Sequence, residues 1–444
     1  MFTPELLSPA GSLKALRLAF AYGADAVYAG QPRYSLRVRN NEFDLATLEM
    51  GINEAHVLGK KLYVVVNIAP HNSKLQSFIA DMAPVVALKP DALIVSDPGV
   101  VYLLKQHFPQ MPLHLSVQAN TVNWAAVKFW QAQGVERVIL SRELSVDEIG
   151  EIRREVPDME IEVFVHGALC MAYSGRCLLS GYINKRDPNQ GACTNSCRWP
   201  YQVHSAVEDE VGQFKPISTP ALLEEQGRPG ELMAIDEDLH GTYILNSKDL
   251  RAIEHVPALT AMGVHSLKIE GRTKSPYYVA RTAQVYRQAI DDAVAGKAFN
   301  PALLGELNGM ANRGFTEGFL RRHKPQDTQN YDTSHSVGEQ LLVGEFIGEQ
   351  DSEGFALVEV KNQFGIGDTL VLMTPKGNHS FSFSLSALRD KQDNALLLAP
   401  GACYQLKVQL PLRTGLGYAM LLKQLPAAAQ ASAELAIDAT ATVS

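Results

Sequence analysis

Short apolar runs rich in β-branched residues alternate with stretches of helical periodicity along the first two thirds of the chain. Three of these runs are introduced alike, by YGADAVYAG, QGVERVILS and MGVHSLKIE, where a glycine ends a helix and the next residues enter a strand. The predicted strands are Leu6-Leu7, 26–29, 62–66, 92–95, 113–115, 137–140, 161–165 and 266–269. Eight strands alternating with helices predict an α/β fold, a parallel (β/α)8 barrel of the TIM type.

The stretches between these runs carry helix signals. Residues 12–22 form a helix that Ser12 can cap, and residues 45–58 place apolar side chains at helical spacing. Residues 277–295 are predicted to form the helix that closes the barrel, and Asn246 to Asp249 resemble the start of a further helix.

The pattern changes twice after the seventh strand. Residues 171–262 form an insertion far longer than an ordinary connection, typical of a lid or a substrate platform. Alternating apolar and polar positions then predict a small antiparallel β-barrel domain over 335–425, and the Ala/Ser/Thr-rich residues 426–444 are predicted to be a disordered tail. The catalytic barrel, with its insertion, is therefore assigned to 1–330 and the small domain to 335–425.

Composition limits the class of protein. The 444 residues are 46% hydrophobic, enough for a full core and more than one domain. A secretory signal and an apolar run of about 18 residues are both missing from the sequence, so we expect a cytoplasmic protein without a membrane partner. Lys and Arg total 40 against 48 Asp and Glu, a net charge of −8. A nucleic-acid partner would therefore need a local basic patch.

Four of the five cysteines, Cys170, Cys177, Cys193 and Cys197, lie in one glycine-rich stretch with the spacing C-x6-C-x15-C-x3-C. The clustering indicates a metal centre. Structural zinc favours pairs two to four residues apart, which only the second pair provides, whereas an iron–sulfur cluster tolerates the wider gap. A [4Fe-4S] cluster is favoured, with zinc, free thiols or a disulfide as alternatives. Cys403 lies in an apolar strand-like run and is interpreted as a buried structural residue.

Polar residues stand just past the ends of several predicted strands, where a barrel carries its chemistry. Arg142 and Arg272 could bind carboxylates or phosphates, and His166 or Glu270 could move protons. Asn67 and Gln118 complete the predicted substrate-binding mouth. The alternative is an ordinary polar rim, in which a glutamate pairs with its neighbouring arginine.

The segment EVFVHGALC, from Glu162 to Cys170, followed by GRCLLS, from Gly175 to Ser180, matches the signature E-x-F-x-x-G-A-L-C-x4-G-x-C-x-x-S of peptidase family U32. The opening ELLSPAGS and the segment LKIEGR are similar to that family as well. The length and the C-terminal β domain narrow the resemblance to members that hydroxylate tRNA.

The resemblance implies an RNA-modifying enzyme despite the peptidase label. Such members carry a [4Fe-4S] cluster on cysteines and form 5-hydroxyuridine at the wobble position, U34, without molecular oxygen, with prephenate as an implicated metabolite. Carried over to this chain, Cys170, Cys177 and Cys193 match family ligands, and Cys197 is the local candidate for the fourth. The implied partners are the tRNA anticodon loop, prephenate or a similar small carboxylate, and an electron donor. Tyr173, beside the cysteines, could stack on the base or pack the loop.

Two other function classes stay open. A U32-type, collagenase-like peptidase could pair Cys170 with His166, but three further thiols would then have no role, and the motifs H-E-x-x-H and G-x-S-x-G are absent from the sequence. A non-catalytic iron–sulfur protein would keep the cysteines without needing the polar mouth.

Overall fold

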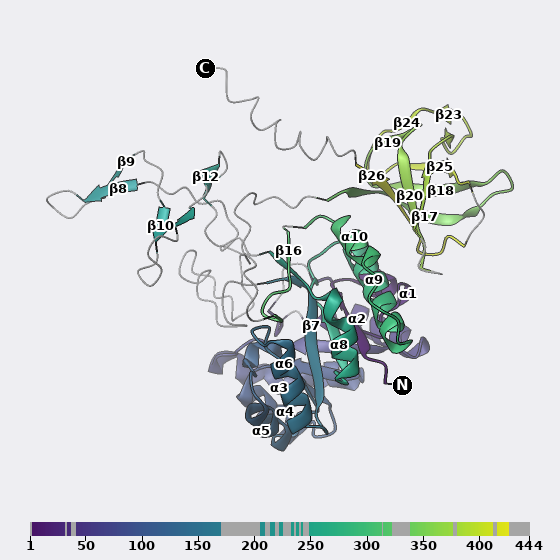
Figure 1. Ribbon diagram of the computed structural model, residues 1–444. Helices are drawn as coiled ribbons and strands as arrows, with labels where there is room; N and C mark the ends of the chain where they lie inside the picture. The colour runs from purple at the N-terminus through teal and green to yellow at the C-terminus, as the bar shows by residue number, and fades with distance from the viewer. Residues whose placement is uncertain are drawn as a thin grey trace.

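The fold is described from a computed structural model (Figure 1). The structure describes residues 2–31, 33–36, 41–169, 248–312, 314–321, 338–375, 380–411 and 415–425, together with the backbone of short strands between 205 and 242. From Glu5 to Ala168 strands and helices alternate as the sequence predicts.

Eight parallel strands close into a barrel. Hydrogen bonds join them in the order β15-β1-β2-β3-β4-β5-β6-β7, and β15 also pairs in parallel with β7, which closes the ring. All eight predicted strands are present, so the (β/α)8 prediction is confirmed. The barrel strands are β1 Glu5–Ala10, β2 Ala26–Gly30, β3 Lys61–Val66, β4 Ala92–Val95, β5 Leu113–Leu115, β6 Arg137–Ile139, β7 Glu160–Ala168 and β15 Ser266–Ile269.

Helices follow the strands and cover the outside of the barrel (Figure 1). They are α1 Leu13–Ala21, α2 Leu45–Val57, α3 Asn72–Ala87, α4 Pro98–His107, α5 Trp124–Ala132, α6 Val146–Glu155, α8 Val256–Ala261, α9 Pro276–Val294 and α10 Ala302–Asn308, with short 3-10 turns η1 Val117–Ala119 and η4 Ile253–His255.

Polar caps determine where several of these helices begin. Ser12 accepts a hydrogen bond from the backbone N–H of Ala15, as predicted for α1. Ser145 and Glu148 form a reciprocal capping box at the start of α6, and Ser275 caps α9 ahead of Pro276. Because α1, α6 and α9 begin just after the carboxyl ends of strands, these caps also position the loops around the barrel mouth.

One helix prediction is wrong. Asn246 and Ser247 lie outside the described residues, but the next residues form strand β14, Asp249–Arg251, which pairs antiparallel with Ala168, Gly167 and His166 of β7. The cap-like sequence is overridden because this segment supplies hydrogen-bond partners to the end of β7. Strand β16, Phe315–Thr316, then adds to β14 in parallel.

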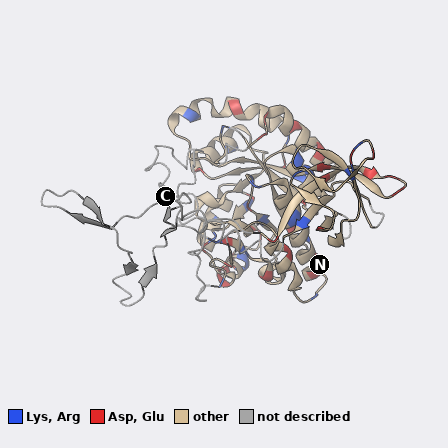
Figure 2. Ribbon diagram, turned by 90° about the horizontal axis from the view of Figure 1, so that it is seen from above, with Lys and Arg blue, Asp and Glu red and all other residues tan. Residues whose placement is uncertain are grey.

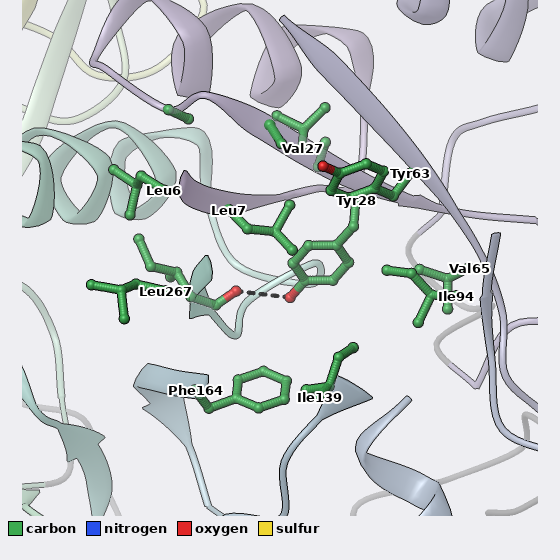
Figure 3. Close-up of a cluster of buried hydrophobic side chains, with 14 of the residues drawn as sticks. Leu6, Leu7, Val27, Tyr28, Tyr63, Val65, Ile94, Ile139, Phe164 and Leu267 are labelled. Carbon is green, nitrogen blue, oxygen red and sulfur yellow. Dashed lines mark hydrogen bonds between the residues drawn. The ribbon is translucent and has the colours of Figure 1, made fainter. Parts of the chain in front are cut away.

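The interior of the barrel is packed with side chains from several strands. Figure 3 shows Leu7, Tyr28, Ile139 and Phe164 converging on its centre. The Tyr28 hydroxyl donates a hydrogen bond of 2.9 Å to the carbonyl of Ile269, so this polar tip is satisfied inside the core. The interior is thus a filled core, and chemistry is confined to its carboxyl end.

The C-terminal strands form a separate antiparallel curled sheet, ordered β21-β20-β26-β17-β18-β25-β22-β23. Their bounds are β17 Gln340–Gln350, β18 Phe355–Val360, β20 Thr369–Met373, β21 Ser380–Ser384, β22 Leu388–Arg389, β23 Ala395–Leu396, β25 Gln405–Gln409 and β26 Met420–Gln424, with β19 Phe364–Gly365 and β24 Leu398–Ala399 forming a small second pair. The predicted second β domain is confirmed as part of the fold class. The predicted tail lies outside the described residues.

The sheet docks on the barrel beside α1 and α9. Val371, Met373, Met420 and Leu422 belong to the barrel's hydrophobic core cluster. The hydroxyl of Tyr22, at the end of α1, donates to the carbonyls of Met373 and Tyr418 at 3.2 and 3.0 Å. The C-terminal sheet is therefore packed on the barrel.

Cys403 departs from its predicted environment. It lies in a turn before β25, exposed, with φ at +71°, and is not part of an apolar strand. The turn backbone donates from Cys403 N–H to the carbonyl of Val360, so the position is determined by the turn rather than by burial of the thiol.

Basic and acidic positions both occur at several places along the described ribbon (Figure 2). None of the helices in the described ranges combines the length and apolar character needed to cross a lipid bilayer.

Candidate active site at the barrel mouth

The residues that follow β3 and β5 form one hydrogen-bonded network. Asn67 Nδ2 donates to Gln118 Oε1 at 2.9 Å and to Ser116 Oγ at 3.2 Å, and the Ser116 hydroxyl donates to the same Gln118 oxygen. Asn67 Oδ1 accepts from the backbone N–H of Leu36 at 3.2 Å. The structure therefore brings together the predicted pair Asn67 and Gln118 and adds Ser116.

A second group joins the ends of β6, β7 and β15. Arg142 donates to Glu270 Oε2 and to the carbonyl of Ala168, both at 3.2 Å, and its guanidinium lies 4.0 Å from the centre of the Phe164 ring. Arg142 Nε is buried and has no hydrogen-bond partner within the described structure. The polar-rim alternative pairs a glutamate with its neighbour in sequence, whereas Arg142 and Glu270 pair across two strand ends, and one N–H of Arg142 has no protein partner among the described residues.

Arg272 is buried on the β2 side of the mouth. It donates to the Ser35 hydroxyl at 2.6 Å, and its guanidinium lies 5.7 Å from the Tyr28 ring centre. Gly30 is needed for this approach, because a Cβ there would lie 2.6 Å from Arg272 Nη1. Burial, and then Glu270, raise the pKa of the Tyr28 hydroxyl, which stays protonated near neutral pH.

His166 occupies an aromatic environment at the end of β7. Its ring lies 5.4 to 5.8 Å from the rings of Tyr278, Tyr286 and Phe315, and its Nδ1 is 3.3 Å from the Tyr286 hydroxyl. Burial lowers its pKa to about 3, so the imidazole is neutral at physiological pH. Such a ring could accept a proton only at a large cost, and a catalytic role for His166 stays a prediction.

Below the mouth lies a buried ion pair that the sequence analysis did not single out. Lys268 Nζ donates to Glu162 Oε1 at 2.7 Å and lies over the rings of Tyr28 and Phe164, at 4.4 and 5.5 Å from their centres. Burial lowers the pKa of Lys268, against the effect of Glu162. The sequence contains an indication of this ion pair, because Lys268 in LKI and Glu162 in EVF are charged residues at inward positions of otherwise apolar strands.

At the amino end of the barrel the network continues through Arg137. It donates to Glu5 at 2.5 Å, to Glu162 at 3.2 Å and to Glu160 at 2.8 Å through Nε, and the Tyr63 hydroxyl donates to Glu5 at 2.6 Å. Burial alone would raise the pKa of Glu5, but Arg137 outweighs it and holds that pKa below its usual range. This base network joins β1, β3, β6, β7 and β15.

The predicted metal ligands, Cys170, Cys177, Cys193 and Cys197, and the predicted stacking residue Tyr173 lie outside the described residues. Within the described ranges, no group of three or more His, Cys, Asp or Glu side chains is arranged to hold a metal ion. Strand β7 ends at the mouth with Ala168, two residues before Cys170 in the sequence.

The mouth therefore combines oriented amide donors with an arginine–glutamate pair above a closed core. Amides and arginine bind carbonyl and anionic oxygens, while the apolar surroundings strengthen such contacts. This arrangement fits a polar, planar or anionic small group that enters from the carboxyl end of the barrel.

Comparison with known proteins gives a consistent assignment. The sequence model of "Peptidase family U32" matches residues 11–330, and that of "Peptidase family U32 C-terminal domain" matches residues 339–423. The chain is 63% identical over 443 residues to tRNA hydroxylation protein P of Escherichia coli (strain K12), covering 95% of this chain and 97% of that protein.

Two further proteins are also similar to this chain in sequence. Identity to tRNA hydroxylation protein P of Haemophilus influenzae (strain ATCC 51907 / DSM 11121 / KW20 / Rd) is 58% over 447 residues, covering 96% of this chain and 97% of that protein. Identity to 23S rRNA 5-hydroxycytidine C2501 synthase of Escherichia coli (strain K12) is 34% over 318 residues, covering 71% of this chain and 42% of that protein.

Proposed function

The chain belongs to peptidase family U32, and from this membership and its barrel mouth we propose that it is an RNA-modifying hydroxylase acting on tRNA. The observation that carries the proposal is the 63% identity to tRNA hydroxylation protein P, which extends over 95% of the chain and therefore includes both the barrel and the C-terminal sheet. The oriented polar groups at the mouth support an enzyme rather than a scaffold.

The finer proposal is oxygen-independent formation of 5-hydroxyuridine at U34. The reaction breaks the C5–H bond of uracil and forms C5–OH; with water as the oxygen source, uracil and one water give 5-hydroxyuracil, two protons and two electrons, and the proposal includes an external acceptor that takes the two electrons through a redox cofactor. A [4Fe-4S] cluster on Cys170, Cys177, Cys193 and Cys197 would supply one-electron transfer when bound. The cysteine spacing, and the end of β7 at the mouth two residues before Cys170, support this assignment.

The chain's own residues are proposed to bind and orient. Arg142 and Arg272 would hold the carboxylate of prephenate or a similar small acid, Asn67 and Gln118 would contact the base, and Glu270 would position Arg142. A target base has to leave its stack to reach the mouth, which an anticodon loop permits at low cost.

The peptidase alternative gains no support from His166. A cysteine peptidase activates its thiol through a histidine that is readily protonated, whereas the pKa of His166 is lowered to about 3 by burial. His166 also packs against three aromatic rings, which would have to move for the imidazole to serve a thiolate.

The decisive experiment is mass spectrometry of tRNA nucleosides from a strain that lacks this gene. We expect 5-hydroxyuridine and its derivatives to disappear and to return on complementation with the wild-type gene. Unchanged levels in a strain that also lacks any other tRNA hydroxylase would exclude the proposed function.

The cofactor proposal has its own test. Protein purified without oxygen is assayed for iron, acid-labile sulfide and visible absorbance, comparing Cys170→Ser with Cys403→Ser. Cys403 is exposed and lies in the C-terminal sheet domain, so its replacement should leave the cofactor intact. Equal iron and sulfide in both variants would contradict the ligand set, and zinc in place of iron would contradict the cluster.

A further inference from the structure

Gln118 is held in one orientation by a chain of hydrogen bonds that begins at the backbone. The N–H of Leu36 can only donate, so the atom of Asn67 that faces it is the oxygen. Asn67 Nδ2 therefore points the other way, toward Gln118, and the atom of Gln118 that it meets at 2.9 Å is the oxygen. The Ser116 hydroxyl donates to the same oxygen.

This chain leaves the amide nitrogen of Gln118 unused. Both hydrogen bonds to the Gln118 side chain end on Oε1, and among the described residues Nε2 has no partner. Gln118 is half-buried, and its Nε2 is not among the buried side-chain nitrogens that lack a partner, so the NH2 group is accessible to solvent. Its side chain extends from the end of β5 to Asn67 at the end of β3, across β4, which lies between them.

The opposite orientation of the Gln118 amide is disfavoured because it would place donors against donors. Turning the Gln118 amide over would set its NH2 against the NH2 of Asn67, two donors face to face, and would leave the Ser116 hydroxyl without its acceptor. Asn67 is 6% exposed and Ser116 is 3% exposed, so water could not easily replace the lost bonds. The orientation of the Gln118 NH2 group is therefore fixed before any ligand binds.

We propose that Gln118 is a specificity-determining residue that reads the O4 carbonyl of a uracil base and rejects cytosine. The proposal rests on the proposed function, because only then is the ligand a pyrimidine. Uracil presents a carbonyl oxygen at position 4, where cytosine presents an amino group. The fixed NH2 group of Gln118 can donate a hydrogen bond to the carbonyl oxygen of uracil. In cytosine it would face an amino group, which is also a donor. The contact also positions C5, the atom next to C4.

Two substitutions reverse the polarity of this contact by different routes. Gln118→Glu keeps the shape and one oxygen for Asn67 but presents an oxygen, not an NH2, to the base. Asn67→Asp removes the donor that holds Gln118 Oε1, so the Gln118 amide should turn over and present its oxygen. Gln106→Glu, on the exposed side of α4, makes the same chemical change away from the mouth and is the matched control.

The test measures affinity of the full-length, cofactor-loaded protein for two anticodon stem-loops that differ only by uridine or cytidine at the target position. Wild type and Gln106→Glu should prefer uridine by about ten-fold or more, the effect of one unsatisfied buried donor. In Gln118→Glu and Asn67→Asp the preference should vanish or invert. A loss of packing alone would weaken both RNAs equally and leave their ratio unchanged.

Complementation separates this inference from the proposed function. If wild type restores 5-hydroxyuridine derivatives and Gln118→Glu keeps the wild-type ratio of uridine to cytidine affinity while folded, the assignment of Gln118 is overturned. If wild type restores none, the proposed function fails, whatever the ratios are. Circular dichroism and thermal melting of each variant establish that it is folded.

Discussion

The two ends of the barrel interior both carry polar and charged groups, but among the described residues the charged groups of the base are paired with one another, whereas groups at the mouth keep N–H donors for a ligand. At the base, Arg137, Glu5, Glu162 and Lys268 each have a charged partner, and three of them are nearly or fully buried. At the mouth, Gln118 keeps an unused NH2 group and Arg142 an unused N–H. A closed network holds strands together, whereas an incomplete one is suited to binding.

The difference has an energetic reason. Burying a charge is costly, and a buried pair offsets that cost only when its hydrogen bonds are complete. The base meets this condition through side chains from five strands. At the mouth the side chains of Arg142 and Glu270 are partly exposed, at 13% and 22%, so losing their ion pair leaves charges that water can reach. The comparison therefore predicts large stability effects at the base and mainly functional effects at the mouth.

Removing Glu162 should produce the largest loss of stability. Glu162→Ala removes the carboxylate that Lys268 and Arg137 share and leaves these two buried cations without it. We therefore expect the free energy of unfolding to fall by about 3 to 5 kcal/mol. Urea denaturation followed by circular dichroism measures the change.

The control and a second variant test the cause. Glu151→Ala removes an exposed carboxylate on α6 and should change stability by no more than about 0.5 kcal/mol. The double variant Glu162→Leu with Lys268→Met removes both charges together and should recover much of the loss. A double variant as unstable as Glu162→Ala would mean that packing, not an unpaired charge, dominates.

Acid should destabilise the protein through its buried histidines, one at each end of the barrel. Burial lowers the pKa of His114, near the base, and of His166, at the end of β7, where it is about 3. A native pKa below the unfolded value of about 6.5 means that the unfolded chain binds more protons as pH falls toward 3. Stability is therefore full above pH 6.5 and is lost below it.

The measurement compares urea unfolding of wild type and His166→Gln at pH 7.5 and pH 5.5. His166 alone should contribute a loss of about 1.4 kcal/mol over that interval, which the variant should lack. Because each protein is compared with itself at the two pH values, the packing cost of the substitution cancels. Equal pH dependence in the two proteins would show that the pKa of His166 is not lowered by folding.

The strands of the barrel were predictable because they are short apolar runs between helical stretches, three of them introduced by a glycine that ends a helix. The position of His166 was not. Regular alternation along β7 would place His166 on the same face as Glu162 and Phe164, but the register between β7 and β15 shifts at Lys268/Ile269. The ring of His166 therefore meets Tyr278 and Tyr286 of the outer helix α9, an irregularity that local periodicity does not encode.

The candidate site was only partly predictable for a similar reason. Strand-end positions indicated Asn67, Gln118, Arg142, Arg272 and Glu270, because the barrel fold alone brings such positions to one mouth. Pairing is a property of three dimensions, so neither the Arg142–Glu270 contact nor the hydrogen bond between Asn67 and Gln118 could be derived from spacing. The strand β14 was missed because its partner, β7, determines its conformation.

Removing Arg142 should separate function from stability. Arg142→Ala loses a partly exposed ion pair and the contact with Phe164, which together stabilise the fold on the order of 1 kcal/mol. Modification of tRNA in the complemented deletion strain should fall at least about ten-fold if Arg142 binds an anionic substrate group. Arg154→Ala, exposed on α6, is the control and should restore modification fully. A loss of iron together with activity would instead make Arg142 structural.

The smallest effect is expected from replacing Ser96, because its side chain contacts only the backbone of the mouth network. Its hydroxyl donates to the carbonyl of Asn67 at 3.0 Å, while the orientation of Gln118 depends on the Asn67 side chain. Ser96→Ala should therefore lower the free energy of unfolding by about 0.5 to 1.5 kcal/mol and leave the uridine preference intact. Stem-loop affinities and urea unfolding measure both. If Ser96→Ala abolished the preference, the mouth would behave as the base does, as one cooperative network whose every bond matters, and the contrast between the two ends would fail.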